Sequence, residues 1–133
     1  MKSLLRSGKR RTAIARAIIK EGKGRVTING KPIEIIEPEI VRLKLMEPFY
    51  FLDEKTKNSI DIKVKVKGGG YMGQTDASRT AITRALLAWT ESEQLRAKFL
   101  EYDRHMLVGD PRRREPKHFG GPGARAKYTK SYR

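Results

Sequence analysis

The sequence predicts an α+β domain over residues 1–108, in which helices pack against a small sheet, and a long extended basic tail over residues 109–133. Alternating apolar residues predict strands before residue 68, and apolar residues at helical spacing predict two helices after it. The last 25 residues contain four glycines, three prolines and only three large apolar side chains. Such a segment cannot bury enough surface to offset its ordering entropy, so we expect it to be extended or disordered in isolation.

The first predicted strand covers residues 12–20, where the alternation of apolar residues favours a strand over a helix. Its two faces would carry Ile14 and Ile18 on one side and Ala13, Ala15, Ala17 and Ile19 on the other. A turn at residues 21–24 leads to a second strand with Val26 and Ile28 on one face. Asn29-Gly30 then predicts a reverse turn, because both residues tolerate positive φ.

Two prolines bracket the next predicted element, a short helix. Pro38 would be its first residue and Pro48 would end it. Its apolar stripe would consist of Ile36, Ile40, Leu43 and Met46. After a turn at residues 53–58 comes the clearest strand of the chain, with Ile60, Ile62, Val64 and Val66 on one face and Asp61, Lys63, Lys65 and Lys67 on the other. One face of this strand should therefore be buried, and the other should be solvated and mostly positive.

A glycine-rich run over residues 68–73 leads into the strongest predicted helix. Its apolar stripe would consist of Ala77, Ala81, Ile82, Ala85, Leu86 and Trp89, with Arg79 and Arg84 off the stripe. A second helix is expected to start at Thr90, where Glu93 would complete a capping box. Its inner face would consist of Leu95, Phe99, Tyr102 and Met106.

The glycine run matches part of a dinucleotide-binding fingerprint, and Glu91 and Glu93 fall near the spacing of a ribose-binding acid. In that fingerprint the acid ends a second parallel strand, whereas residues 91–106 are predicted to be helical, so we reject a nicotinamide enzyme. Two uses of the glycines stay open. Their bare backbone N–H groups suit phosphate oxygens, including those of RNA, and a tight strand-to-helix turn alone would also favour glycine.

Basic residues concentrate at the two ends of the chain. Residues 1–25 hold nine basic side chains and one acid, residues 109–133 hold eight against two, and the body between them holds 13 against 12. A generally basic, soluble surface would spread its charge over the body as well. A near-neutral body with two cationic ends instead indicates a nucleic-acid-binding protein that grips its ligand with its ends.

Composition excludes several other classes of protein and site. The chain has no cysteine, hence no disulfide or Cys-based zinc site, and His105 and His118 lack metal-ligand spacing. Neither a membrane-length apolar run nor a signal-peptide core is present, which predicts a cytoplasmic protein. We expect no enzyme activity, cofactor or metal, because no nucleophile stands beside a base and no acids are paired for acid–base chemistry.

The basic clusters lie at residues 9–11, 112–114 and 125–133, and Phe119, Tyr128 and Tyr132 are interleaved with the cations of the tail. Arginine planes and aromatic rings stack on unpaired bases while lysines and arginines neutralise phosphates. No helix carries enough base-reading residues to enter a DNA groove. RNA or single strands are therefore the predicted ligand.

Three motifs, in order along the chain, resemble one family. GKRRTAIARA at residues 8–17 resembles the N-terminal signature of ribosomal protein nine of the small subunit. GGGYMGQ at residues 68–74, with the helix that follows, resembles its central signature. DPRR at residues 110–113 and GGPGARAKYTKSYR at residues 120–133 resemble the archaeal and eukaryotic branch rather than the bacterial one.

The resemblance implies a two-layer fold, with helices on one face of a small mixed sheet, and a tail threaded through the rRNA of the small-subunit head towards the peptidyl-site tRNA. Neighbouring ribosomal proteins would be further partners, and the location would be the cytoplasmic ribosome. The rRNA-binding residues would be Lys9, Arg10, Arg11, Arg16, Gly69, Gly70, Arg79, Arg112, Arg113, Arg114, Lys117, Arg125, Lys127 and Tyr128. The tRNA-contacting residues would be Lys130, Ser131, Tyr132 and Arg133.

Two other functions are alternatives to this one. A free-standing RNA-binding protein or RNA chaperone would also have basic disordered ends, but it would not travel with the small subunit. A nucleic-acid-processing enzyme would need an acidic metal cluster, which the sequence does not contain.

Overall fold

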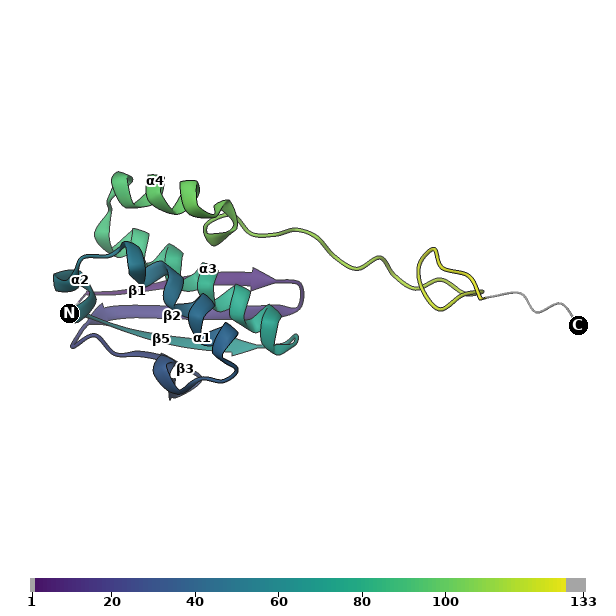
Figure 1. Cartoon of the computed structure of the whole chain (residues 1–133), viewed down its shortest axis with the longest axis horizontal. Helices are drawn as coiled ribbons and strands as arrows, with labels where there is room; N and C mark the ends of the chain where they lie inside the picture. The colour runs from purple at the N-terminus through teal and green to yellow at the C-terminus, as the bar shows by residue number, and fades with distance from the viewer. Residues whose placement is uncertain (1, 129–133) are drawn as a thin grey trace, which may run out of the picture.

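The computed structural model describes residues 2–128 and shows a sheet with all of the described helices on one side (Figure 1). The sheet has five strands in the order β1-β2-β5-β3-β4. Only β3 and β5 pair in parallel, and the other neighbouring pairs are antiparallel. The strands are β1 (Ser3–Arg10), β2 (Ala13–Glu21), β3 (Val26–Ile28), β4 (Lys31–Pro32) and β5 (Ile60–Lys67). The predicted α+β class with a mixed sheet is confirmed.

The described part of the chain has four α-helices, of which α3 packs directly on the sheet: α1 (Glu39–Met46), α2 (Glu54–Asn58), α3 (Tyr71–Thr90) and α4 (Glu93–Tyr102). The long helix α3 lies across β1, β2 and β5, and α1 packs beside it (Figure 1). α4 lies on the outer side of α3 and leads to the segment that leaves the body. The core fills the space between the sheet and these helices.

The strand β1 was not predicted, and Gly8 explains why. A Cβ atom at Gly8 would lie 2.2 Å from the carbonyl oxygen of Ala77 and 2.7 Å from the amide nitrogen of Ala81, both in the backbone of α3. The helix therefore occupies the space in which a side chain at position 8 would otherwise stand. A strand covered by helix backbone needs no apolar alternation, so its sequence carries little of the usual signal.

The predicted alternation of β2 and β5 is confirmed. Ala13, Ala15, Ala17 and Ile19 are buried beneath α3, whereas Ile14 and Ile18 lie on the opposite, open face of the sheet. The inward residues of β5 are buried as well. The predicted turn at Asn29-Gly30 joins β3 to β4, with both residues at positive φ.

The predicted face of the helix α1 is wrong at its centre, although Ile36 and Met46 at its two ends are partly buried against the core. Ile40 and Leu43 are 54% and 49% exposed, and the buried residues of α1 are Val41 and Leu45. Pro38 is the N-cap rather than the first helical residue, and Pro48 lies buried in a 3₁₀ turn that continues the chain. Val41 and Leu45 are one helical turn apart and therefore face the core together. The predicted stripe included neither of them. Residues 54–58 form the short helix α2 instead of the predicted turn.

The predicted start of the last helix is also wrong. Thr90 ends α3, and its hydroxyl donates to the carbonyl of Leu86 at 2.9 Å. Glu91 takes a left-handed conformation, and Ser92 is the N-cap of α4, its hydroxyl accepting from the amide of Leu95 at 3.3 Å. The predicted inner residues of this region are buried except for Tyr102, which is 54% exposed.

Candidate nucleic-acid interface

The tip of the β1–β2 hairpin and the glycine run meet at one end of the sheet. Gly68 and Gly69 have positive φ, and a Cβ atom at Gly68 would lie 2.4 Å from the carbonyl oxygen of Thr12. The tight turn thus explains the glycines at these two positions. Gly70 differs, because its φ is −92° and a Cβ atom there would meet no atom within 4 Å.

A cavity of about 460 Å³ opens between this hairpin tip and the first turn of α3. Arg11, Gly69, Gly70 and Tyr71 are among its lining residues, and all four are exposed. Arg11 has a positive φ of 53°, which is uncommon for a residue with a side chain. The structure therefore brings two predicted cations, Arg10 and Arg11, and two predicted glycines together around an open, solvent-accessible hollow.

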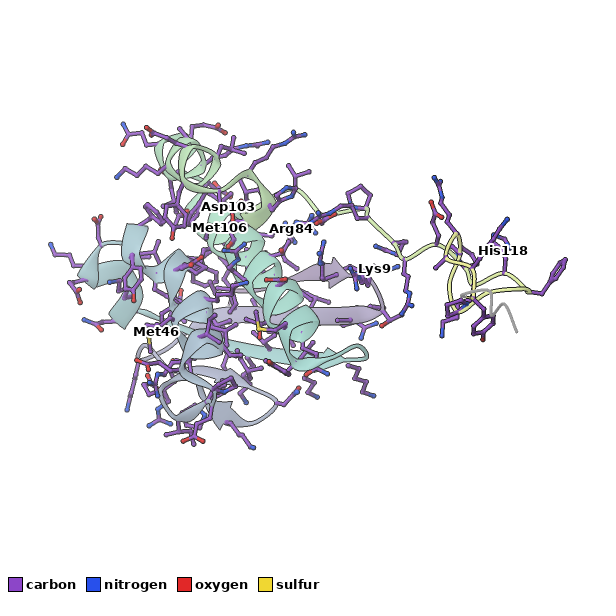
Figure 2. The ribbon with its side chains drawn as sticks, turned by 45° about the vertical axis from the view of Figure 1, so that its right-hand side comes forward. Lys9, Met46, Arg84, Asp103, Met106 and His118 are labelled. Carbon is purple, nitrogen blue, oxygen red and sulfur yellow. The ribbon has the colours of Figure 1, made fainter. Side chains whose placement is uncertain are left out.

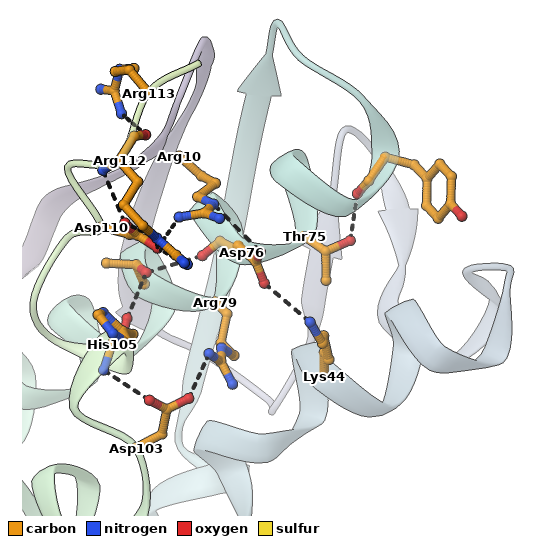
Figure 3. A network of polar contacts seen from close by, with 12 residues as sticks. Arg10, Lys44, Thr75, Asp76, Arg79, Asp103, His105, Asp110, Arg112 and Arg113 are labelled. Atoms are coloured by element: carbon orange, nitrogen blue, oxygen red, sulfur yellow. Dashed lines mark hydrogen bonds and ion pairs between the residues drawn. The ribbon is translucent and has the colours of Figure 1, made fainter. Parts of the chain in front are cut away.

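Asp110 fixes the beginning of the tail to the body (Figure 3). Its carboxylate forms an ion pair with Arg10 at the end of β1, and the two residues also form an isolated parallel β-bridge. Arg112 donates to the same carboxylate through its side chain, at 2.6 Å from Nη2, and through its backbone amide at 3.0 Å. The hydrogen bonds from Arg112, together with Arg10, hold the pKa of Asp110 well below its usual range. The carboxylate is thus charged wherever the protein is folded at neutral pH.

Arg84 makes a second link between the tail and the body. Its Nε donates to the carbonyl of Leu107 at 3.0 Å, and its Nη1 donates to the carbonyl of Ser7 at 2.9 Å. The guanidinium therefore joins α3, β1 and the segment after α4. Neither Arg84 nor Asp110 was among the predicted binding residues, since the contacts that link the tail to the body, Arg84 with Ser7 and Asp110 with Arg10, join residues far apart in the sequence.

Arg79, predicted to bind rRNA, is paired within the protein. Its Nη2 donates to Asp103 at 2.9 Å and its Nη1 donates to Glu47, and only 11% of its side chain is exposed. Burial acts to lower the pKa of Arg79, but Glu47 and Asp103 outweigh it, so that the pKa lies above its usual value. This geometry gives Arg79 a structural role in joining three elements, and its contact with rRNA stays a prediction.

The chain beyond Asp110 runs away from the body without helix or strand as far as Tyr128 (Figure 1). Lys9 lies at the end of the body from which this segment departs, and His118 lies far out on it (Figure 2). Arg125 donates to Glu115 through two nitrogens, at 3.0 and 2.9 Å, and this pair closes a loop. Phe119 is fully exposed within this segment, and Tyr128 is 70% exposed.

The predicted cations differ in how much of their charge is free. Lys9, Arg11 and Arg16 are exposed, whereas Arg10 is half-buried against Asp110. The predicted cations and the aromatic group of the described tail are all exposed: Arg112, Arg113, Arg114, Lys117, Arg125, Lys127 and Tyr128. The four residues predicted to contact tRNA, 130–133, lie outside the described residues.

Within residues 2–128, no three His, Asp or Glu side chains gather as metal ligands would. Over the same residues, no helix is both long and apolar enough to cross a membrane.

Known proteins match the chain over its full length. The family model described as ribosomal protein S9/S16 matches residues 8–133. The small ribosomal subunit protein uS9 of Methanothrix thermoacetophila is 56% identical over 133 residues, which cover 100% of both chains. The uS9 protein of Halobacterium salinarum is 52% identical over 96% of each chain, and that of Desulfurococcus amylolyticus is 49% identical over 100% of this chain and 94% of its own.

These relatives bear the name of a structural ribosomal protein and not that of an enzyme, as the sequence predicts. The resemblance drawn from the three motifs is confirmed, and it extends over the basic tail. The chain belongs to the ribosomal protein S9/S16 family, and its similarity is to the uS9 proteins of the small subunit.

Proposed function

We propose that this chain is a structural constituent of the small subunit in the cytoplasmic ribosome, where it binds the rRNA of the head beside neighbouring proteins. Its tail would reach the anticodon region of the peptidyl-site tRNA. The observation that carries the proposal is a tail that is fixed to the body at its start and exposed beyond that point. A near-neutral body holds the root of a strongly cationic segment at one defined point, through Asp110 and Arg84.

The tail supports RNA as the ligand through the kinds of side chain that it exposes. Phe119 and Tyr128 are uncovered and stand among arginines and lysines. Solvent exposure does not stabilise an aromatic ring, whereas stacking on an unpaired base does, and the cations neutralise phosphates. Arg113, Arg114 and Lys117 have no ion-pair partner among the described residues, so their charge is available for phosphate.

The hollow at the hairpin tip offers a second contact for rRNA. Gly70 leaves its backbone open at the start of α3, and Arg11 stands beside it with an exposed side chain. Backbone N–H groups at a helix start and a nearby guanidinium both favour phosphate. Gly69 and Gly70 therefore remain proposed rRNA contacts, with Lys9, Arg10, Arg11 and Arg16 around them.

Deletion of residues 109–133 tests the role of the tail. The deletion removes eight cations. If about half of them contact phosphates, the slope of log affinity against log salt should flatten by roughly three units, at about 0.7 per contact for a single strand. The measurement compares small-subunit rRNA binding of the two chains across a salt series. An unchanged slope would place the RNA contacts on the body and contradict the proposed role of the tail.

A free-standing RNA chaperone is the competing function, because exposed basic segments serve it equally well. The two functions differ in where the chain is found in a lysate. A ribosomal protein travels with the small subunit, whereas a chaperone is distributed over many RNAs.

A further inference from the structure

The face of the sheet opposite the helices is open, and the strand register arranges its side chains in rows. One row consists of Lys9, Ile14 and Lys67, the next of Ser7, Arg16 and Lys65, and the third of Leu5, Ile18 and Lys63. Lys20 and Asp61 follow in a fourth row. We call these residues of β1, β2 and β5 the open face. The described helices all lie on the other side of the sheet (Figure 1).

The open face carries a net positive charge that the protein does not neutralise. Its six cations are Lys9, Arg16, Lys20, Lys63, Lys65 and Lys67. None of the six forms an ion pair with another described residue. Asp61 is the single acid of the four rows, and it accepts hydrogen bonds from the backbone amides of Lys23 and Arg25, both at 2.9 Å. These bonds lower the pKa of Asp61 and hold its carboxylate towards the neighbouring turn.

The lysines of β5 are regularly spaced along one strand. Alternate residues of a strand point to the same face and lie about 6.8 Å apart, so Lys63, Lys65 and Lys67 form a straight row of cations. Arg16 stands beside Lys65 on the neighbouring strand. A repeating row of unpaired cations has charge complementarity with a repeating polyanion, and like charges brought this close together cost free energy unless a counter-charge covers them.

The uncharged side chains of the open face indicate which part of an RNA would lie on it. Leu5, Ile14 and Ile18 are 54%, 38% and 43% exposed, and no aromatic residue occurs in the four rows. With no aromatic ring and with Arg16 as its single arginine, the face offers little surface on which splayed bases could stack. Aliphatic groups between cations suit the sugar edges of a helical RNA, whose shallow minor groove presents ribose between two phosphate backbones.

We propose that the open face binds the ribose–phosphate backbone of helical rRNA, separately from the contacts of the tail. This inference rests on the proposed ribosomal function and adds a surface and a class of RNA structure to it. The tail would take unpaired RNA through its rings, and the open face would take double-stranded RNA through its rows of cations. Lys63, Lys65 and Lys67 are the residues that carry the prediction.

The triple variant K63Q/K65Q/K67Q of the full chain tests the inference. Its matched control is K55Q/R96Q/K98Q, which removes three exposed cations from α2 and α4 on the helix-covered side. The probe is a short blunt-ended RNA duplex, and affinity is measured across a salt series. Loss of three phosphate contacts should flatten the slope of log affinity against log salt by about two to three units, and the control should leave the slope nearly unchanged.

A second pair of variants keeps the cations and adds one carboxylate. Ile18→Glu places the charge at the centre of the open face, and Leu100→Glu places it on α4, where Leu100 is 42% exposed. We expect Ile18→Glu to weaken duplex binding several-fold and Leu100→Glu to leave it unchanged. Far-UV circular dichroism and thermal unfolding establish that each variant is folded.

Three results would overturn the inference. Equal flattening by both triple variants would mean that only total charge matters. Unchanged slopes for both would mean that RNA does not lie on the open face. Capture of an acidic protein by the face, with normal duplex binding by K63Q/K65Q/K67Q, would assign the face to a protein partner. Failure of the unmodified chain to enter small subunits would instead contradict the proposed function itself, so the two failures are distinguishable.

Discussion

Replacement of Gly8 by alanine should destabilise the protein severely, because α3 packs directly on the backbone of β1. The added Cβ would lie 2.2 Å from the carbonyl oxygen of Ala77, whereas ordinary contact begins at 3.4 Å. Helix and strand would have to separate by roughly 1 Å at this point. Both partners are backbone atoms held in hydrogen-bonded elements, so no side chain can rotate away to relieve the overlap.

Overpacking of a core costs about 1–3 kcal/mol, and the rigidity of this contact puts Gly8→Ala near the upper end, at about 3 kcal/mol. With a urea m-value of about 1.5 kcal/mol per molar, this cost would lower the unfolding midpoint by about 2 M. Gly70→Ala is the matched control, since its Cβ would meet no atom within 4 Å. We expect Gly70→Ala to lower the free energy of unfolding by only about 0.5 kcal/mol, because alanine is a poorer N-cap than glycine.

Urea unfolding of both variants can be followed by circular dichroism and by the fluorescence of Trp89, the only tryptophan. Trp89 lies in α3 and is partly buried, so its emission reports on the packing of that helix. Equal midpoints for Gly8→Ala and Gly70→Ala would refute the reasoning, because the close approach of α3 to β1 would then have no energetic consequence.

Four further predictions concern individual contacts. Arg79→Met should lower the free energy of unfolding by about 1–2 kcal/mol, because Glu47 and Asp103 lose a partly buried partner. If the folded variant also shows a flatter slope of log rRNA affinity against log salt, Arg79 contacts RNA as well. Gly70→Val should weaken rRNA binding without strain from positive φ, and normal binding by the folded variant would exclude close phosphate approach there. Because the pKa of Asp110 is depressed, its link to Arg10 is complete above the pKa of an unfolded aspartate and is lost only as pH falls through the folded value. Backbone motion at residues 109–112, measured by amide relaxation, should therefore stay constant between about pH 7 and 5 and should become faster in Asp110→Asn. Faster motion of these residues in the unmodified chain as pH falls from about 7 to 5 would contradict the role given to Asp110. Deletion of residues 130–133 should weaken peptidyl-site tRNA binding by about 1 kcal/mol with normal subunit assembly, and unchanged tRNA affinity and dissociation rate would contradict the tRNA role.

Burial pattern decided which strands could be predicted from the sequence. β2 and β5 each have one face under α3 and one open face, and their residues alternate accordingly. β1 is the edge strand beside β2 and also packs against α3, but at Gly8 the backbone of α3 takes the place of an inward side chain, so the apolar signal is weak. Gly8 can be seen in the sequence, but its packing against the backbone of α3 cannot, so β1 could not be predicted from it.

Helix faces and boundaries depended on tertiary contacts that short patterns do not encode. In α1 the spacing of Ile40 and Leu43 is as helical as that of Val41 and Leu45, and only the position of α3 and the sheet decides which pair is buried. At the end of α3, both Thr90 and Ser92 are acceptable N-caps. The left-handed conformation of Glu91 places the break after Thr90 and selects Ser92.

The candidate site was predictable as composition and not as geometry. Exposed cations and rings of the tail, such as Arg113 and Tyr128, can be read from the sequence because nothing in it could bury them. The contacts that fix the start of the tail to the body could not be predicted in the same way. Arg84 binds the carbonyl of Ser7, 77 residues away, and Asp110 binds Arg10. The tail was expected to move freely from Gly109, whereas the structure anchors its first residues to β1.

The partition of the chain between small subunits and the rest of a lysate tests the proposed function most directly. A sucrose gradient separates the small subunit from free RNA and protein, and an antibody to the chain measures its distribution. We expect nearly all of the protein in the small-subunit and whole-ribosome fractions, and release to the top of the gradient only at high salt, as contacts with phosphate require. A chain that remains at the top of the gradient at low salt, or that spreads over RNAs of all sizes, would contradict a role as a constituent of the ribosome.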